Sequence, residues 1–466
     1  MKYINLVGSQ VNKNLFIYLN GEVLMIYELL IVLIILLWLS FMFNRKDILA
    51  PSFIFCISFV FSCIWAIIYA KEWELKLHFN TFLVISVGVL IFLLTSCLIK
   101  LFFDGIKGNN YIHQKTELKK IEIEKWKKIV CVIYCIFTIL YTLNAIKNAV
   151  NGSWRNITDA INTYRTGNLF LNKNVALPSM VYYTRIIAAT LAYWYIYVII
   201  NNYLIDKKVD FLSVVIILLC VISDITTGSR GDAINLILAT IPISYLLLKK
   251  SRGFDKHIEF KTILKVIICG IIFLTIFQQT ALLLGRSSKY DPMYYLAIYC
   301  GAQIKNLDTF LQENEKIIRT SHNSWGSQTF INAKKWLEPK ISGEYKKYEF
   351  DLPFRKINGK SLGNVYTTFY PYIYDFGYTG LIVLVAIMSI IAQSVYEVSK
   401  RTNAELKPDI FIIIYSQMFS LLVLAFFSNK FYEEIFNRSF IYNIILLNAF
   451  NFIFCKIKIQ NKKKDF

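Results

Sequence analysis

The stretch Val23–Phe43, with the sequence VLMIYELLIVLIILLWLSFMF, is almost wholly apolar. It is about as long as the ~20 residues that a helix needs to cross the hydrocarbon core of a bilayer. Ten further apolar runs follow it, and each predicts a spanning helix because every backbone polar group must be paired within lipid. These runs are Ala50–Ala70, Thr81–Phe103, Ile129–Ile146, Met180–Ile200, Phe211–Ile225, Ala233–Leu248, Ile263–Leu284, Leu381–Val398, Ile410–Phe427 and Phe440–Cys455.

The sequence therefore predicts an all-α, polytopic membrane protein with about 11 transmembrane helices. Its composition agrees, because 56% of the residues are hydrophobic and only 18% are charged, with a mean hydropathy of +0.47. A soluble globular chain has about 45–50% apolar and about 25% charged residues. No other stretch is long and polar enough for a soluble domain, so we interpret residues 1–466 as a single integral membrane domain.

One long polar segment, Gly285–Gly380, interrupts the series of apolar runs. It lies between the last-but-three and the last-but-two predicted spans. A membrane protein that keeps one large loop on one face is expected to place its specific chemistry there, since loops carry binding and catalytic residues on a rigid scaffold.

Lysines and arginines gather in alternate loops, which by the positive-inside rule face the cytoplasm. This places the C-terminus in the cytoplasm, and the Gly285–Gly380 loop and the N-terminus outside, with the first run as a retained helix. The formal charge of +20 is then a topology signal and a contact with anionic lipid headgroups, not a nucleic-acid surface. The basic groups are Arg45–Lys46, Lys107–Lys128, Lys207–Lys208, Lys249–Lys256, Lys400–Arg401 and Lys456–Lys464.

Cofactor and metal chemistry find no support in the sequence. Eight of the nine cysteines sit in apolar runs as small apolar filler, and no CxxC metal site or disulfide framework is visible. The four histidines are too scattered along the chain for a metal cluster. A nucleotide loop of the G-x-x-x-x-G-K type is also missing, which argues against ATP-driven transport. We therefore expect no cofactor and no metal.

Arginines mark the predicted outer face. In the segment Trp154–Asn168, Arg155 and Arg165 are expected on one face of a short interfacial helix with Thr158 as its N-cap. Arg165 is the candidate ligand contact, whereas Arg155 is a candidate for either ligand binding or anchoring to lipid headgroups. Arg185, near the outer end of a predicted span, is a further candidate.

Two more arginines lie next to glycines at the ends of spans. Arg230 is bracketed by Gly228 and Gly231 in the turn between two short runs, and Arg286 stands where a span enters the long loop. A simple external turn and ordinary helix-end snorkelling are the competing interpretations. The arginine fork matches diphosphate oxygens, so converging arginines suit a polyanionic headgroup.

Three features, taken in order, resemble the O-antigen polymerase (Wzy-type) family of oligosaccharide repeat-unit polymerases. They are the T-G-S-R-G turn at Thr227–Gly231, the arginine- and tyrosine-rich entry at Arg286–Tyr299, and the block at Gly363–Gly380 that opens with G-N-x-Y-T and ends with D-F-G-x-x-G. The layout is similar from about Leu140 onward.

The resemblance implies a glycosyltransferase that joins undecaprenyl-diphosphate-linked oligosaccharides into a surface polysaccharide, an O-antigen or a capsule, at the outer leaflet of the bacterial inner membrane. A departing diphosphate needs stabilisation by positive charge. Arg165, Arg230 and Arg286 are the candidates to supply it, and no metal need assist. His322 and Asp375 are candidate general bases, with helix N-capping as the alternative role of Asp375. The remaining candidate substrate contacts are Asn364, Tyr366 and Tyr295.

Two other functions remain open at the level of sequence. An O-antigen ligase shares the architecture and differs only in its acceptor. A flippase for the same lipid-linked sugars would line a central path with charge and show repeated halves, neither of which is apparent. The expected partners are the lipid-linked oligosaccharide, membrane lipids, and a chain-length regulator and flippase of the same pathway.

Overall fold

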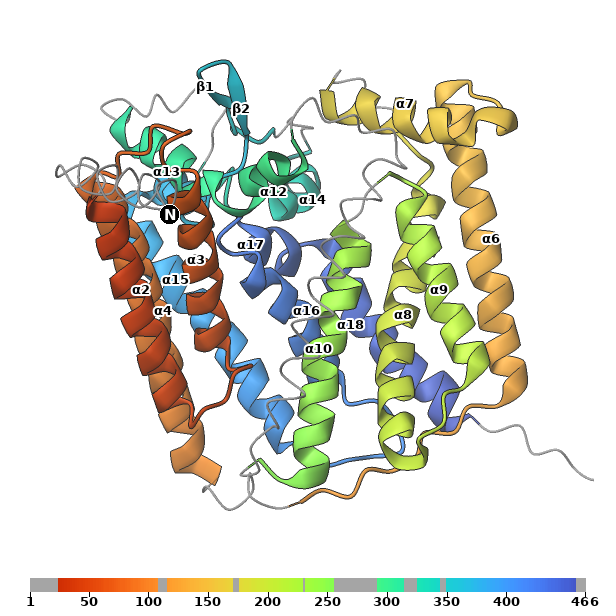
Figure 1. Cartoon of the computed structure of the whole chain (residues 1–466). Coiled ribbons are helices and arrows are strands. Elements are labelled where there is room, and N and C mark those ends of the chain that lie inside the picture. The colour runs from red at the N-terminus through yellow and green to blue at the C-terminus, as the bar shows by residue number, and fades with distance from the viewer. Residues whose placement is uncertain are drawn as a thin grey trace, which may run out of the picture. The chain divides into compact units, whose positions relative to one another are not determined.

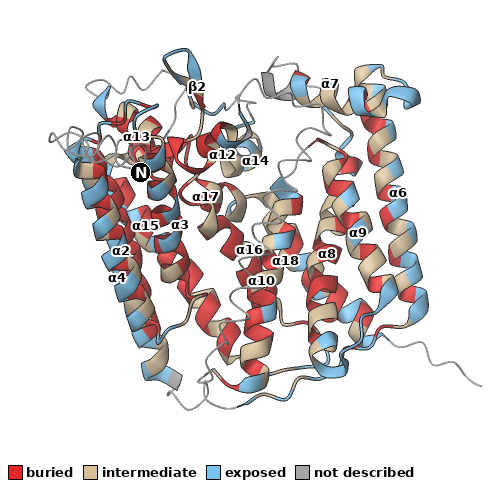
Figure 2. Cartoon of the chain, viewed as in Figure 1, coloured by how far each residue is buried: buried red, intermediate tan, exposed pale blue. Residues whose placement is uncertain are grey.

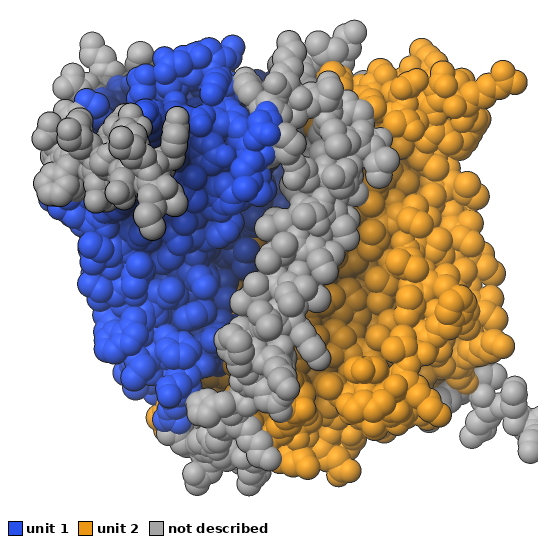
Figure 3. Space-filling view, in the orientation of Figure 1, with its two compact units in different colours: residues 1–102, 290–394, 421–437 blue, residues 103–289, 395–420, 438–466 orange. Residues whose placement is uncertain are grey.

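The computed structural model describes residues 24–107, 115–170, 176–228, 231–254, 291–313, 325–343 and 349–457 (Figure 1). The chain divides into two compact units, each assembled from distant parts of the sequence (Figure 3). Unit 1 comprises Met1–Phe102, Tyr290–Ser394 and Leu421–Asn437, and unit 2 comprises Phe103–Lys289, Val395–Ser420 and Arg438–Phe466. The interpretation of residues 1–466 as one membrane domain stays a prediction.

Ten of the predicted spans are helices in the described residues, which confirms an all-α polytopic membrane protein. Eight are long and apolar enough to cross a membrane, with α18 continuing into a π-helix, and two apolar helices are shorter. Ile263–Leu284 lies outside the described residues, so the total of 11 stays a prediction. The ten are α2 (Leu24–Phe43), α3 (Pro51–Ile68), α4 (Phe79–Lys107), α6 (Lys125–Val150), α8 (Ser179–Asp206), α9 (Phe211–Ile225), α10 (Gly231–Arg252), α15 (Phe369–Arg401), α16 (Ile410–Val423) and α18 (Arg438–Phe450) with η3 (Asn451–Lys456).

Unit 1 is built on α2, α3, the larger part of α4 and the first part of α15. One face of α2, with Ile26, Leu29 and Leu33, is buried, while Ile31 and Trp38 on its other face are exposed (Figure 2). Apart from Glu28, the exposed residues of α2 are apolar, which is typical of a helix in contact with lipid. In the core, aromatic rings join the helices. Phe55 stacks on Phe92 at 4.2 Å between ring centroids, and Phe59 stacks on Phe369 at 5.0 Å.

The Gly285–Gly380 segment contains regular structure where it is described. It holds α12 (Pro292–Cys300), α13 (Ala302–Gln312), α14 (Ile331–Ser342) and an antiparallel hairpin of β1 (Arg355–Ile357) and β2 (Lys360–Gly363). Gly301 joins α12 to α13 directly on α3, since a Cβ there would lie 2.7 Å from the Ala66 backbone nitrogen. A larger residue would therefore push the two elements apart.

The helix α15 begins at Phe369 and is interrupted by a kink at Gly377, so its apolar part after the kink starts close to the predicted span start at Leu381. The part of the predicted loop from Tyr370 to Phe376 is therefore helical, and the sequence did not predict this short helix before the kink. Its tyrosines pack along that helix, with Tyr370 and Tyr374 5.8 Å apart between ring centroids. Gly377 breaks the helical geometry with φ 68° and ψ −164°, a backbone conformation that favours glycine. Burial of the tyrosine rings outweighs the turn-like composition of this stretch.

Unit 2 is arranged around α8, which packs against α6, α9, α10 and α18. The Trp194 indole N–H donates to Asn451 Oδ1 at 2.8 Å, which ties α8 to the π-helix. The π-helix is held in turn by Lys127, whose buried ammonium donates to the Ile453 carbonyl at 3.0 Å. Short apolar helices can thus be kept in place by polar contacts at their ends.

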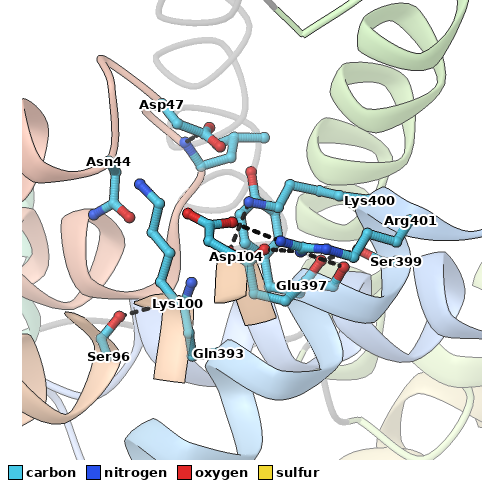
Figure 4. A network of polar contacts seen from close by, with 12 residues as sticks. Asn44, Asp47, Ser96, Lys100, Asp104, Gln393, Glu397, Ser399, Lys400 and Arg401 are labelled. Atoms are coloured by element: carbon cyan, nitrogen blue, oxygen red, sulfur yellow. Dashed lines mark hydrogen bonds and ion pairs between the residues drawn. The ribbon is translucent and has the colours of Figure 1, made fainter. Parts of the chain in front are cut away.

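A buried ionic network closes one end of α15 in unit 2 (Figure 4). Arg401 pairs with Asp104 at 2.7 Å and also with Glu397, and Lys400 pairs with Glu397 at 2.6 Å. Lys250 pairs with Asp409 at 3.0 Å in the same unit. Some basic residues that mark the predicted cytoplasmic loops therefore pair with buried acids. Removing one partner of such a pair would be destabilising, because it leaves a buried charge without compensation.

Candidate functional site

The helix α7 (Ile157–Phe170) follows a short 3₁₀ turn, η1 (Trp154–Asn156). The prediction of Thr158 as an N-cap is wrong, because Thr158 lies inside α7. Arg155 belongs to the 3₁₀ turn and is exposed, whereas Arg165 is half-buried on α7. The two arginines therefore do not share one helix, contrary to the prediction. The exposed position of Arg155 fits an anchor to lipid headgroups.

The structure brings Arg165 to the glycine turn that follows α9. A Cβ at Gly228 would lie 3.0 Å from Arg165 Cδ and 3.3 Å from Ile161 Cγ2. Ile161 and Arg165 are four residues apart and so lie on the same face of α7. Gly228 has φ +73°, which only glycine adopts readily. Two segments that the sequence singled out separately thus form one surface of unit 2.

Arg185 holds the helix ends on either side of that turn. Its Nη2 lies 3.5 Å from the Asp224 carbonyl at the end of α9 and 3.9 Å from Asp232 Oδ2 in the first turn of α10. Its Nε is buried and has no hydrogen-bond partner among the described residues, and neither has the buried Ser223 Oγ. A half-buried guanidinium with a spare donor can both position these helix ends and bind an anion.

Arg438 is an additional arginine that sequence reasoning missed. It begins α18, and its guanidinium carbon lies 4.1 Å from the centroid of the Tyr182 ring. The Tyr182 hydroxyl bonds Ser439 Oγ at 2.7 Å, and Tyr182 precedes Arg185 by one turn of α8. Stacking on an aromatic ring leaves the N–H fork of an arginine pointing along the ring plane. The available signal was its position at the edge of the last apolar run.

Asp375 in unit 1 is buried and accepts hydrogen bonds from two backbone N–H groups, those of Gln328 at 3.1 Å and Thr329 at 2.6 Å. It therefore ties the segment before α14 to α15. The N-cap alternative is wrong, because the carboxylate accepts backbone N–H groups of another segment of the chain. A role as general base stays a prediction, for which the carboxylate would have to give up these contacts.

The remaining candidates of unit 1 differ in exposure. Tyr366 is buried, and burial raises the pKa of its hydroxyl. That hydroxyl accepts from Arg355 Nε at 3.1 Å and donates to the Pro353 carbonyl at 3.0 Å. Tyr295 is half-buried and donates its hydroxyl to Tyr299 at 3.2 Å, and Asn364 is half-buried beside the hairpin. Tyr366 therefore supports the hairpin, while Tyr295 and Asn364 keep polar atoms near the surface.

Three predicted residues, Arg230, Arg286 and His322, lie outside the described residues. Within the described part of the chain, no group of three or more His, Cys, Asp or Glu side chains is placed to hold a metal ion.

A family model described as "O-antigen polysaccharide polymerase Wzy" matches residues 13–289 of the chain. The match covers more than half of the chain and includes Arg155, Arg165, Arg185 and the Thr227–Gly231 turn. It begins well before Leu140, where the resemblance in layout was placed, and it ends before the Gly363–Gly380 block. No curated protein and no solved structure matched the chain.

Proposed function

The chain belongs to the O-antigen polysaccharide polymerase Wzy family, and from this premise we propose that it joins undecaprenyl-diphosphate-linked repeat units at the periplasmic face of the inner membrane. Family membership and eight apolar helices make it a multi-pass membrane protein that polymerises O-antigen repeat units. The proposal adds the lipid carrier, the face of the membrane and the means by which the leaving group is stabilised. In it, the long loop is periplasmic and the C-terminus cytoplasmic.

In the proposed reaction, a hydroxyl at the non-reducing end of a newly delivered unit attacks the anomeric carbon of the growing chain. The bond between that carbon and the diphosphate oxygen breaks, and the lipid diphosphate leaves with the electron pair. Negative charge on the diphosphate grows in the transition state, so fixed cations aimed at it lower the barrier. Mutational losses of one such donor elsewhere are about 10²–10³-fold in rate.

The packing of the Gly228 turn on Arg165 is the observation that carries the proposal. It makes Arg165 part of a preformed surface whose neighbouring turn contains Arg230 in the sequence. We assign Arg165, Arg230 and Arg286 to the diphosphate and Arg185 to positioning the ends of α9 and α10. Arginine suits this task because its planar fork binds two oxygens at once. No metal is needed in this scheme, since the guanidinium groups supply the positive charge.

The proposal gives the protein a place in surface-polysaccharide assembly. Its substrate is the lipid-linked oligosaccharide, delivered by a flippase, and a chain-length regulator is the expected partner during growth. An O-antigen ligase would use the same donor and leaving group but a core sugar as acceptor. The identity of the acceptor therefore separates the two activities.

The experiment is deletion of the gene in the native host, followed by complementation and separation of surface polysaccharide on a gel. We expect the deletion to leave core with a single repeat unit, wild type to restore the ladder, and Arg165→Ala to fail at equal membrane abundance. Arg252→Ala is the matched control, because Arg252 is an exposed arginine at the end of α10, in its last turn. Core without any repeat unit would instead indicate a ligase or a flippase, and an unchanged ladder with intact capsule would contradict the proposal.

A further inference from the structure

Arg438 is a half-buried cation of unit 2 that the proposed reaction has not used. Lys250, Lys400 and Arg401 of the same unit each pair with an acid. Among the described residues, no carboxylate forms an ion pair with Arg438. It also opens α18, and a cation at the N-terminal end of a helix opposes the helix dipole. Neither an ion pair nor the stability of α18 therefore accounts for this arginine.

The ring of Tyr182 holds the Arg438 guanidinium in place. The guanidinium carbon lies 4.1 Å from the centroid of that ring. The ring is itself fixed from both helices, because its hydroxyl bonds Ser439 Oγ at 2.7 Å and its edge packs on Tyr183 at 5.4 Å between centroids. Tyr183 in turn packs on Tyr442 of α18 at 5.8 Å. Stacking occupies the face of the guanidinium and leaves the N–H groups at its edge available for an anion.

The stack of Arg438 on Tyr182 lies next to Arg185. Tyr182 and Arg185 are three residues apart on α8 and therefore lie on the same face of that helix. The buried Nε of Arg185 has no hydrogen-bond partner among the described residues. Two guanidinium groups thus flank one turn of α8, and both keep donors that the described side chains do not use.

Arg185 connects this place to the arginine on α7. The Asp224 carbonyl accepts from Arg185 Nη2 at 3.5 Å and from the Thr227 hydroxyl at 3.4 Å. Thr227 directly precedes Gly228, where a Cβ would lie 3.0 Å from Arg165 Cδ. All of these residues belong to unit 2. The stack is therefore at the same end of the same unit as Arg165.

We propose that Arg438 is a further ligand of the diphosphate leaving group and that the Tyr182 ring positions it; this inference rests on the proposed function. The guanidinium fork binds two oxygens of one phosphate at once. Its attraction grows as the bond between the anomeric carbon and the diphosphate oxygen breaks, because the electron pair passes to the diphosphate. Arg438 itself gains and loses no proton, so the step requires no further reactant.

The phosphate of a phospholipid headgroup offers Arg438 the same chemistry. Arginine at the end of an apolar helix commonly reaches such headgroups. A diphosphate carries more negative charge than the phosphodiester of phosphatidylglycerol. A ligand of the leaving group therefore discriminates between these two lipids, whereas a headgroup anchor does not.

The test measures binding of undecaprenyl diphosphate and of phosphatidylglycerol to the full-length protein in a neutral detergent. Arg438→Gln is the key variant, because it removes the charge and keeps a polar side chain. We expect its Kd for undecaprenyl diphosphate to rise about 10–100-fold, the loss of one hydrogen-bonded charged partner, and its Kd for phosphatidylglycerol to stay unchanged. Arg252→Gln is the matched control, because Arg252 is exposed in the last turn of α10, and it should bind both lipids as wild type does.

Tyr182 is tested as a positioning residue. Tyr182→Leu removes the ring and should weaken binding of undecaprenyl diphosphate, whereas Tyr182→Phe keeps the ring and should largely retain it. When Arg438 is already glutamine, Tyr182→Leu should cost nothing more, because the ring acts through the arginine. A Tyr182 that is merely structural would weaken binding by the same factor in both backgrounds, which would reject the positioning role.

Two results overturn the inference and leave the proposed function standing. One is an Arg438→Gln protein that binds undecaprenyl diphosphate as tightly as wild type while Arg165→Ala binds it weakly. The other is an equal loss for both lipids, which means a headgroup anchor. Wild-type protein that binds undecaprenyl diphosphate no better than phosphatidylglycerol overturns the proposed function, and the inference with it.

Arg438→Lys decides the matter if Arg438→Gln unfolds at a lower temperature than wild type. Lysine keeps the positive charge but binds as a point charge without the fork. A stable Arg438→Lys protein with weakened binding of undecaprenyl diphosphate alone supports the inference, and unchanged binding rejects it.

Discussion

At the scale of single residues, acidic and basic side chains of unit 1 mostly fasten one segment to another. Arg355 is an example, because its guanidinium pairs with Glu313, with 2.6 Å between Nη1 and Oε1, and also bonds the Tyr366 hydroxyl. Asp308 and Asp375 bind backbone N–H groups in the same way. Charged residues in a polar segment are therefore poor indicators of a site until their partners are known.

Asp375→Asn separates a structural role of Asp375 from a chemical one. The amide offers one acceptor oxygen in place of two and brings two donors toward the N–H groups of Gln328 and Thr329. We expect a loss of about 1–3 kcal/mol in the free energy of unfolding, the usual cost of a buried group left unpaired. Thermal unfolding of the purified protein measures it. A protein of unchanged stability with much reduced polymerisation would instead indicate that Asp375 is the general base.

At the scale of elements, the apolar runs predicted the bounds of several helices accurately. The predicted Phe211–Ile225 has the bounds of α9, and Val23–Phe43 differs from α2 by one residue. The start of α15 was missed because Tyr370–Gly380 contains proline, aspartate and glycines, which are typical of turns. Tyr370, Tyr372 and Tyr374 are buried, and Tyr372 packs on Tyr432, which is far away in the sequence. Such tertiary burial is not visible from local composition.

Gly301→Ala should disrupt the junction of α12 and α13. The added Cβ would lie 2.7 Å from the backbone of Ala66 and 2.8 Å from that of Trp65, which cannot move as a side chain can. We expect a loss of about 1–3 kcal/mol from overpacking, measured as a lower unfolding temperature. Gly105→Ala on α4 is the control, since nothing lies within 4 Å of its Cβ and alanine favours a helix by about 1 kcal/mol. Equal stability of the two variants would contradict this packing.

At the scale of the whole molecule, membrane class, helical architecture and family follow from hydrophobic runs and short motifs in the sequence. The candidate site follows only in part. The sequence predicted both the Thr227–Gly231 turn and Arg165 as parts of a site. Their contact at Gly228 joins residues more than 60 positions apart, so the sequence did not predict that they meet. Arg438 was missed for the same reason, because its aromatic partner Tyr182 lies on another helix. Pairings over such separations depend on the packing of helices, which no local pattern encodes.

We propose that this chain polymerises lipid-linked repeat units with diphosphate as the leaving group. The most direct test is to incubate the purified protein with repeat units extracted from the deletion host and to follow both polymer length and free undecaprenyl diphosphate. We predict a ladder of products, with one lipid diphosphate released for each bond formed, and loss of both with Arg165→Ala. Repeat units that remain single, or that are transferred only when lipid A core is added, would contradict a polymerase activity.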